Sequence, residues 1–552
     1  MRILEKLNRS RFIVLLAFLL SVGYLGWLAS SIHQGIFFAG DQALKSMQVR
    51  QIAAGEGFKY VHLDQPAWVR SIWAQGYFPL RPPFFYPSPN GYLIVYPPLF
   101  QELTAFFYAR LGHAGLYLLP MVCTLLLMLW VVLLLKRCAV TPVNTALALF
   151  VLVFCSPLML YGVMFWEHLP AVLLLFAGLA YIVRPQRRVR DAILLGAISG
   201  LAVWLRPESM VMVLLYGAAV AILFRYDRRN AAHIGFCAGA ALVVLAWFLF
   251  NLVEYGALFG IHGKQVFSDN DPATRMGWRH GWHNLTAIND ISIRHFWLLL
   301  FLVPVFIVLV RRRMERTIRP ATAGAVGFRR PASSGLAHLR LFLLSPPDSA
   351  NLRLFLLSSI VIAYSVITPF FLPNDGIIQW GPRYFLAIIP VTLVTLILAE
   401  MKWPLFGPRT RDRTPRWLAF FAVLAVSASF YRNTHGGGYV AVRYRYNHRL
   451  TDIYRTLARK PGNVVIVSPH YMCYDFGYIF DQNYFFGLTG DDSLRRLLPL
   501  LKKQGVHDYY VIYSPRYHTL PPMLRNSTGT RDAPAGGKWI EQDIALKRYH
   551  LD

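Results

Sequence analysis

Long apolar blocks constrain the fold of this chain more than any other feature of its sequence. Examples are Phe12–Leu28, Leu116–Leu135, Ala171–Val183, Ala231–Leu252 and Phe296–Val310. A run of about 17–25 apolar residues matches the hydrocarbon core of a bilayer, where only a helix satisfies its own backbone groups. With 552 residues, 55% of them hydrophobic and 15% charged, the chain has too little charge to cover a soluble surface of this size. The sequence therefore predicts a polytopic integral membrane protein.

The apolar blocks predict about eleven membrane-spanning helices and a mainly α-helical transmembrane bundle. We place them at 12–32, 115–135, 142–161, 168–184, 191–205, 208–225, 231–253, 294–311, 354–373, 384–401 and 416–431. The first block follows several basic residues, as in a secretory signal, but its apolar run is longer than a typical signal core. We therefore expect an uncleaved anchor.

The net charge of +28 suggests nucleic acid at first sight, but the placement of the basic residues argues against it. The basic clusters lie between apolar blocks, and taken alternately along the chain they fall on one side of the membrane. Because basic loops stay on the inner side, this pattern predicts a cytoplasmic N-terminus and an external C-terminus. We expect membrane lipids as neighbours, no nucleic acid partner, and a place in an inner (plasma) membrane.

This topology divides the chain into two domains, a transmembrane domain at 1–431 and an external soluble domain at 432–552. A long first external loop is expected at 33–114. The inner loop at 312–353 is dominated by Ala, Gly, Pro, Ser and Arg, which predicts a flexible segment. In the tail, a strand, an amphipathic helix and a second strand are predicted at 463–468, 493–504 and 508–514, which is the pattern of a small α/β domain.

The first external loop holds a candidate functional residue, Asp41. From Asp41 onward the apolar residues repeat at helical spacing, and Gly55 is a suitable stop, so the pattern predicts a helix at the outer membrane interface. Asp41 is then either an N-cap of that helix or a general base held at the membrane surface. The spacing alone leaves both interpretations open.

Several short motifs follow Asp41 in a fixed order along the chain. Tyr96-Pro-Pro-Leu99 precedes the second span, and Trp166-Glu167-His168 lies at the outer end of spans three and four. Leu205-Arg206-Pro207-Glu208 follows span five, and Gly381-Pro-Arg-Tyr384 opens a late span. Together they resemble the bacterial members of glycosyltransferase family 39, within the GT-C membrane glycosyltransferases, over residues 1–400. Protein O-mannosyltransferases and the lipid A aminoarabinose transferase are relatives in that family.

The resemblance implies an enzyme of the hexosyl or pentosyl transferase class that takes its sugar from a polyprenyl-phosphate carrier. The phosphate is already a competent leaving group, so the chemistry needs one carboxylate to take the acceptor proton and cations to hold the phosphate. The resemblance assigns the carboxylate to Asp41, and a single displacement would invert the anomeric centre. The mannosyltransferases have an Asp-Glu pair at this position, whereas this chain has Asp41-Gln42, which puts a role for a second carboxylate in doubt.

The expected substrate-binding residues lie at the external ends of the predicted spans. They are Arg206, Arg383, Lys264, Glu167, His168 and Tyr384. Arg206 lies in an apolar context, where a charge near lipid is usually functional, although a local pair with Glu208 is the alternative. Arg383 can equally be a snorkelling side chain at a helix end. Glu167 and His168 can form a purely structural hydrogen-bonded pair.

Other functions remain open at this stage. A transporter or flippase for lipid-linked sugars would show internal repeats or polar residues in mid-span, and a non-catalytic assembly protein would tolerate the loss of Asp41. The expected acceptor is an envelope lipid, glycan or protein. No cysteine or histidine spacing predicts a fixed metal site, while a divalent cation beside the phosphate stays possible as the one cofactor.

Overall fold

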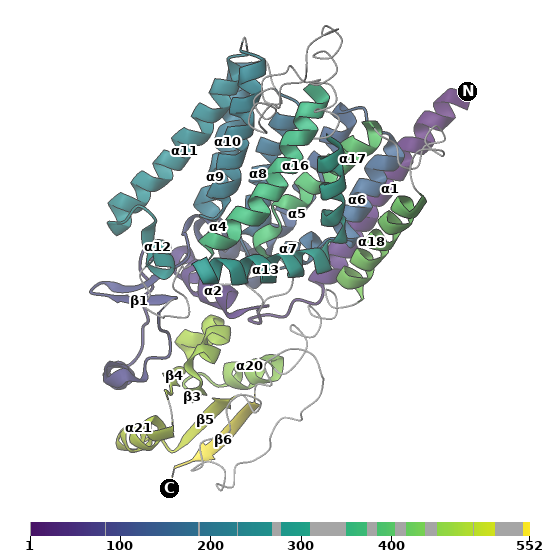
Figure 1. Cartoon of the computed structure of the whole chain (residues 1–552). Coiled ribbons are helices and arrows are strands. Elements are labelled where there is room, and N and C mark those ends of the chain that lie inside the picture. The colour runs from purple at the N-terminus through teal and green to yellow at the C-terminus, as the bar shows by residue number, and fades with distance from the viewer. Residues whose placement is uncertain are drawn as a thin grey trace, which may run out of the picture.

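The computed structural model describes all residues except Met1, 83, 186–187, 229, 268–277, 310–348, 373–382, 403–415, 436–449, 490, 514–544 and 552. Most of the inner loop predicted at 312–353 therefore lies outside the described residues. Helices form one large body, and a small sheet lies beyond one end of it (Figure 1). The predicted class, a helical bundle with a small C-terminal α/β domain, is confirmed.

Each of the apolar blocks forms a helix within the described residues. The helices of the bundle are α1 (Arg2–Ala29), α5 (Gly115–Arg137), α6 (Pro142–Phe154), α7 (Leu158–Gly162), α8 (His168–Val183), α9 (Val189–Leu205), α10 (Ser209–Tyr226), α11 (Ala232–Tyr255), α16 (Ser349–Ile367), α17 (Ile388–Lys402) and α18 (Arg416–Thr434). The block predicted at 142–161 is divided, because α6 ends before Pro157 and α7 begins after it. Helix α16 begins within the segment predicted as a flexible loop.

Five helical segments of the described chain are long and apolar enough to cross a membrane, and a sixth passes if residues 281–309, bent by 105° near His295, count as one span. Helices α6 and α8 are apolar but shorter, at 13 and 16 residues. The full number of about eleven spans therefore stays a prediction. On α11 the exposed Leu242, Leu245, Leu249 and Val253 recur at helical spacing, each more than 60% accessible. Such an uncovered apolar stripe faces lipid, as expected for an integral membrane protein.

The first loop, 33–114, is folded and lies at the end of the bundle that faces the C-terminal domain (Figure 1). It contains α2 (Gly40–Ala53), α3 (Ala67–Ile72), the π-turn η1 (Trp73–Tyr77), the antiparallel hairpin β1 (Phe85–Ser88) and β2 (Gly91–Ile94), α4 (Leu99–Leu111) and the 3₁₀ turn η2 (Gly112–Ala114). The stretch after α11 carries α12 (Gly260–Phe267), α13 (Trp278–His295) and η3 (Trp297–Phe301).

The C-terminal α/β domain has a four-stranded sheet in the order β4-β3-β5-β6. Its elements are α20 (Leu450–Arg459), β3 (Val464–Ser468), the 3₁₀ segment η7 (His470–Gln482), β4 (Tyr484–Gly487), α21 (Asp491–Lys503), β5 (Asp508–Tyr513) and β6 (Ala545–His550). The two strands and the helix predicted from the sequence correspond to β3, β5 and α21. Strand β3 pairs in parallel with both β4 and β5, and β6 adds antiparallel to β5.

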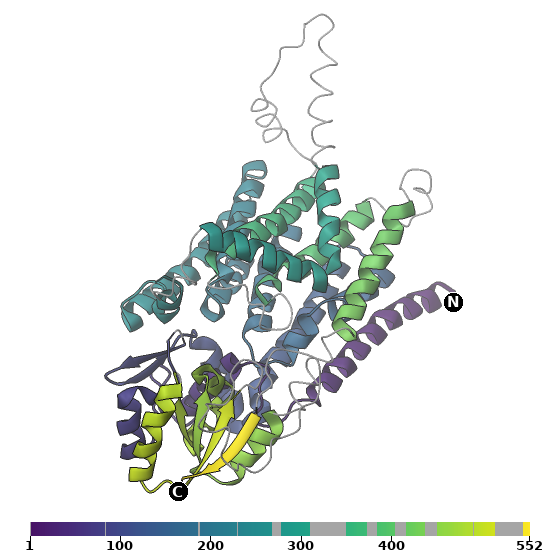
Figure 2. The ribbon, with the colours of Figure 1, turned by 60° about the horizontal axis from the view of Figure 1, so that its bottom comes forward.

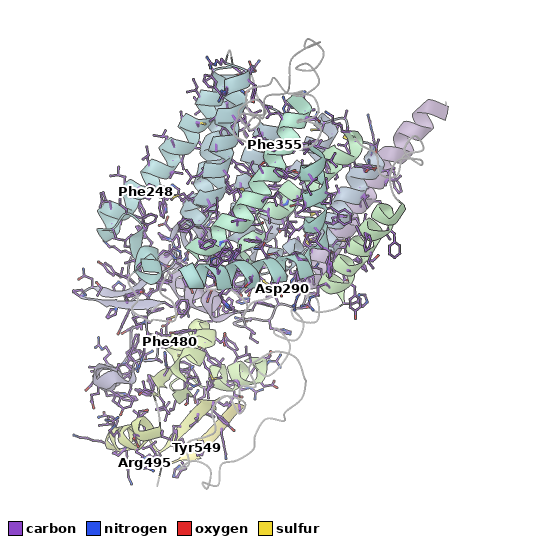
Figure 3. All side chains as sticks on the ribbon, in the orientation of Figure 1. Phe248, Asp290, Phe355, Phe480, Arg495 and Tyr549 are labelled. Carbon is purple, nitrogen blue, oxygen red and sulfur yellow. The ribbon has the colours of Figure 1, made fainter. Side chains whose placement is uncertain are left out.

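Two parts of the first loop join the C-terminal domain to the bundle. The indole of Trp73 donates a hydrogen bond of 2.8 Å to the carbonyl of Phe485 in β4, and Trp68 packs against Tyr484. Figure 2 shows α3 and η1 beside the C-terminal sheet, and Figure 3 places Phe480 of η7 between that sheet and the bundle. The sheet is thus held from the side by the first loop.

Helix α2 lies between the bundle and η7, and eight successive residues of it, from Gln42 to Val49, are buried. The sequence predicted a helix at the membrane surface, and instead both of its sides are covered by protein. Its N-cap is Ala39, with no side-chain hydrogen bond to the helix, and Asp41 lies within the first turn. The interpretation of Asp41 as an N-cap is therefore wrong. Gly55, with φ of +88°, follows the helix end as predicted.

Candidate active site

Charged side chains from four separate parts of the chain meet at the end of the bundle that faces α2. They are Asp41 and Lys45 on α2, Glu167 and His168 at the start of α8, Arg206 and Glu208 in the α9–α10 corner, and Arg383 and Tyr384 in the short turn η5 (Arg383–Phe385). Every one of these groups lies at the end of a helix or in a turn, apart from Lys45. A single cluster results from residues more than 300 positions apart.

Proline explains two of these positions. Pro207 restricts the residue before it, and Arg206 accordingly leaves the helical region with φ −145° and ψ 108°. Helix α9 ends at Leu205, and Arg206, which caps it, presents its side chain at the corner with α10. Pro170 lies in the first turn of α8, where its missing N–H costs no helical hydrogen bond, so Glu167 and His168 lie at the tip of the helix.

Asp41 faces Arg383 across the site. The Nη1 atom of Arg383 lies 3.4 Å from Oδ2 of Asp41, and its Nη2 atom donates a hydrogen bond of 2.8 Å to the hydroxyl of Tyr384. Charge-assisted hydrogen bonds of this type are usually about 2.7–2.9 Å long, so the Asp41 contact is a loose one. The Asp41 side chain is 22% exposed. This carboxylate is both near a cation and accessible.

Glu167 is held more tightly. Its Oε2 atom lies 2.5 Å from the ammonium of Lys45, and its Oε1 atom lies 3.4 Å from Nη1 of Arg206. Arg206 also contacts Glu208 at 3.0 Å and the Nδ1 atom of His168 at 3.1 Å. The predicted local pair of Arg206 with Glu208 is thus present, and it is one part of a larger network.

Among the residues that the structure describes, the charges of the network are balanced. Its carboxylates are Asp41, Glu167 and Glu208, and its cations are Lys45, Arg206 and Arg383, three of each sign. Burying a charge is costly unless a partner compensates it, and this balance makes the buried cluster possible. An anionic ligand can replace one of these carboxylates as the partner of a cation.

Tyr96, which lies before α4, covers the network from the side of the first loop. The Lys45 ammonium lies 4.4 Å from the centre of its ring, a cation–π distance. Burial, together with the negative charges of Asp41 and Glu167, raises the pKa of the Tyr96 hydroxyl well above its usual value. Burial lowers the pKa of Lys45, although the charges of Glu167 and Asp41 oppose that shift.

Two cavities border the network. One of about 300 Å³ is lined by His168, Arg206, Glu208, Arg383 and Tyr384, together with apolar residues of α8 and the turn before α17. The second, of about 540 Å³, begins at Tyr96 and Pro207 and is lined mostly by aromatic and aliphatic side chains: Val95, Leu99, Trp204, Trp247, Phe250, Tyr255, Phe259 and Ile261. The two cavities are lined by consecutive residues of the chain, the polar one by Arg206 and the apolar one by Pro207.

The structure thus brings together Asp41, Glu167, His168, Arg206, Arg383 and Tyr384, which the sequence had named as separate candidates. The side chain of Lys264, on α12, lies outside the described residues. Sequence reasoning missed Lys45. Its position four residues after Asp41 on one helix was a usable signal, because residues i and i+4 share a helix face. No group of three or more metal-ligating side chains occurs in the described part of the chain.

Gln42, which stands where the mannosyltransferases have a second acid, is fully buried. Its Oε1 atom accepts a hydrogen bond of 2.8 Å from the backbone N–H of Phe38. No contact between Gln42 and the charged network is found among the described residues. Among the described residues, Glu167 at the start of α8 supplies a second carboxylate to the same network.

Comparison with known proteins identifies the fold of this chain. No protein-family model matches the sequence, and no curated protein matches it significantly. Solved structures do match. The crystal structure of apo ArnT from Cupriavidus metallidurans is similar over 96% of this chain and 97% of its own, with 13% identity and a TM-score of 0.53. ArnT from the same organism bound to undecaprenyl phosphate is similar over 99% and 98%, with 12% identity and a TM-score of 0.52. ArnT is an aminoarabinose transferase of the GT-C kind, and the fold of this chain is similar to that of ArnT.

Proposed function

We propose that the protein is an inverting glycosyltransferase that moves a hexosyl or pentosyl group from a polyprenyl-phosphate carrier to an envelope lipid, glycan or protein. Asp41 acts as the general base for the acceptor hydroxyl. The observation that carries the proposal is the loose pairing of Asp41 with Arg383 inside an ArnT-like fold. One ArnT structure is bound to undecaprenyl phosphate, which supports a carrier of that class.

The geometry favours Asp41 over Glu167 as the base. Glu167 has two cationic partners, one of them at 2.5 Å, and its side chain is only 9% exposed. A carboxylate held in this way is a poor proton acceptor, because taking a proton would break two buried ion pairs. The ion pair of Asp41 with Arg383 is longer, at 3.4 Å, and the Asp41 side chain is 22% exposed. A general base must reach the proton it takes, and Asp41 meets that condition better.

Arg383 and Arg206 are placed to hold the carrier phosphate. Both guanidinium groups border the smaller cavity, and both lie near the Tyr384 ring, at 4.7 and 5.7 Å from its centre. Phosphate oxygens bound by Arg383 would displace its contact with Asp41, which frees the base at the moment the donor arrives. The two cations would then stabilise the negative charge that develops on the leaving phosphate.

The apolar cavity fits the first part of the polyprenyl chain. It starts beside the polar site and continues between α4, α11 and α12, with an aromatic and aliphatic lining. Contact of such surfaces with an isoprenoid chain removes apolar area from water and would add affinity without affecting the chemical step. The head group and its lipid chain would then occupy two adjoining pockets.

We place the site on the external face of a bacterial inner membrane. The N-terminus of α1 and the C-terminal domain lie at opposite ends of the bundle, and α2 lies at the end near that domain (Figure 1). With the basic loops inside, this end is external. A transporter or flippase is the alternative, and it is less well supported because the charged groups of the site lie at helix ends. A non-catalytic assembly protein would have no need of an accessible, loosely paired aspartate.

The test is sugar transfer by Asp41→Asn in membranes that contain metabolically labelled carrier sugars. Asn keeps the shape but cannot take a proton, so transfer is expected to fall by about 10²-fold or more, while undecaprenyl phosphate binding persists. Asp290→Asn, an exposed aspartate on α13, is the matched control and should transfer normally. Normal turnover in Asp41→Asn would eliminate the base assignment. Movement of carrier sugars across the membrane without any transfer would favour the transporter.

A further inference from the structure

A third cavity lies between the bundle and the C-terminal domain. It encloses about 990 Å³ of space, open to solvent, and is bordered by residues 33–36 between α1 and α2, by α2 and α4, and by α20 and η7. Its lining residues are His33, Gln34, Ile36, Arg50, Tyr108, Thr451, Tyr454, Arg455, Ala458, Tyr478 and Gln482. Nothing in the proposed reaction uses these residues.

This cavity is distinct from the site around Asp41, although both use α2. Arg50 follows Asp41 by nine residues, which on an α-helix means a rise of about 13.5 Å and about two and a half turns. The two side chains therefore point to opposite sides of α2. Asp41 faces Arg383 at 3.4 Å, while Arg50 faces Asp481 of η7 at 2.5 Å.

Tyrosine rings and planar polar groups dominate the lining. The hydroxyls of Tyr108 and Tyr478 lie 3.4 Å apart, and the rings of Tyr454 and Tyr478 are 6.4 Å apart. The Arg50 guanidinium lies 5.2 Å from the centre of the Tyr478 ring. Tyrosine offers an apolar face with a polar tip, and Gln and Arg offer fixed pairs of hydrogen-bonding atoms. This combination suits a ligand with alternating C–H faces and hydroxyl groups, which is a saccharide.

The charged side chains that line this cavity are all basic. Arg50 and Arg455 contribute cations, and none of the lining residues is acidic. One Nη atom of Arg50 binds Asp481, but its Nε atom, which is buried, has no hydrogen-bond partner among the described residues. Arg455 is 61% exposed, and its contact with Asp452 is long, at 4.0 Å. Both cations can accept an anionic partner.

We propose that this cavity binds a saccharide that carries an acidic group, a phosphate or a carboxylate. Its role as a remote part of a glycan acceptor rests on the proposed function, because a ligand here lies on the far side of α2 from Asp41. The tyrosines contact the faces of the sugar rings, and Arg50 and Arg455 bind the acidic group. The C-terminal domain thereby supplies α20 and η7 as one wall of an acceptor groove.

The test is direct binding, without turnover. The full chain is placed in phosphatidylcholine nanodiscs, which avoid sugar-based detergents, and saturation-transfer NMR measures three probes: a glucuronate-containing disaccharide, glucose 6-phosphate and neutral maltose. The two acidic probes are expected to bind more tightly than maltose, and comparing them separates a carboxylate from a phosphate. Arg455→Ala should weaken acidic probes by about five- to tenfold, the effect of one lost hydrogen bond at an exposed position.

Arg459→Ala is the matched control, since Arg459 is an exposed arginine on the same helix that does not border the cavity. Both substitutions are at exposed positions, so the variants should fold alike. Absence of binding by both acidic probes, equal binding of maltose, or equal affinity in Arg455→Ala and wild type would each overturn the proposal. None of these results bears on Asp41→Asn, so failure here and failure of the proposed reaction are distinguishable.

Discussion

The ammonium of Lys45 lies 2.5 Å from the carboxylate of Glu167, and the two side chains are 2% and 9% exposed. This pair joins α2 to the start of α8, and Lys45 is one helical turn from Asp41. The position of the proposed base therefore depends on a buried ion pair. Breaking such a pair leaves one charge buried without its partner. This lowers the stability of the protein far more than replacing both charged residues by apolar ones.

Lys45→Met should lower the free energy of unfolding by about 3–5 kcal/mol, because Glu167 then keeps only its longer contact with Arg206. The double variant Lys45→Met/Glu167→Gln should recover part of this lost stability, because the buried carboxylate of Glu167 is then replaced by a neutral amide. Denaturant titration of the purified protein in one detergent measures both. Equal stability of Lys45→Met and wild type would show that the pair does not anchor α2.

Arg383→Ala should weaken the binding of undecaprenyl phosphate by about 10- to 100-fold, the effect of losing hydrogen bonds from a charged donor. Arg206→Ala should weaken it as well, but it also removes contacts to Glu167, Glu208 and His168, so its stability must be measured in parallel. Equilibrium binding of the carrier to protein in nanodiscs is the measurement. Arg294→Ala, an exposed arginine on α13, is the control. Unchanged carrier affinity in Arg383→Ala would show that Arg383 does not hold the carrier phosphate.

Local patterns were sufficient to predict the helices and several site residues. Apolar runs of bilayer length locate a helix wherever they occur, and Pro157 and Pro207 mark its breaks. Charged residues at helix ends in an apolar context are few, so Glu167, Arg206 and Arg383 were identifiable without a structure. Their convergence depends on how helices pack side by side, which the sequence does not encode locally.

The environment of α2 was not predictable from its own residues. Its apolar residues repeat at helical spacing, so the sequence suggested a helix at the membrane surface. In the structure η7, more than 400 residues away along the chain, covers it. Lys45 was overlooked for the same reason, because a lysine on a surface helix needs no buried partner. Only long-range packing turns it into part of the site.

The sheet edge of the C-terminal domain should respond to acid. Asp508 of β5 contacts Arg548 at 3.0 Å and His550 at 3.2 Å on β6. These hydrogen bonds, with the charges of their donors, lower the pKa of Asp508 below its usual value. A carboxylate with a depressed folded-state pKa adds stability above its unfolded pKa of about 3.9, and that contribution is lost as pH falls through the lower folded-state value.

Unfolding of the C-terminal domain should therefore become easier below about pH 4, and Asp508→Asn should flatten this part of the pH profile. The effect will be small, because all three side chains are close to half exposed or more and solvent screens the contacts. Hydrogen exchange of the β5–β6 amides between pH 3 and 6 measures it, after correction for the intrinsic pH dependence of exchange. Asp492→Asn, an exposed aspartate of α21, is the control. An identical slope in Asp508→Asn and wild type would contradict the assignment.

Two glycines set the distance between α2 and the C-terminal domain. A Cβ added at Gly477 of η7 would lie 2.5 Å from the backbone oxygen of Ala43, and one added at Gly40 would lie 2.7 Å from Cβ of Tyr474. Contacts this short with backbone atoms can be relieved only by moving one element away from the other. Since α2 carries Asp41, the C-terminal domain controls where the proposed base lies.

Gly477→Ala should therefore displace α2 and slow sugar transfer by at least about tenfold, because a shift of 1 Å at a reacting group can cost about 10²-fold. It should also destabilise the protein by about 1–3 kcal/mol, the usual cost of overpacking. Gly26→Ala on α1, where an added Cβ meets nothing within 4 Å, is the matched control and should leave both quantities unchanged.

Carrier affinity distinguishes a displaced base from general misfolding, since Arg383 and Arg206 lie outside α2. A displaced base lowers the transfer rate and leaves carrier binding intact, whereas general misfolding lowers both. Wild-type transfer by Gly477→Ala would mean that the close contact with η7 does not set the position of Asp41.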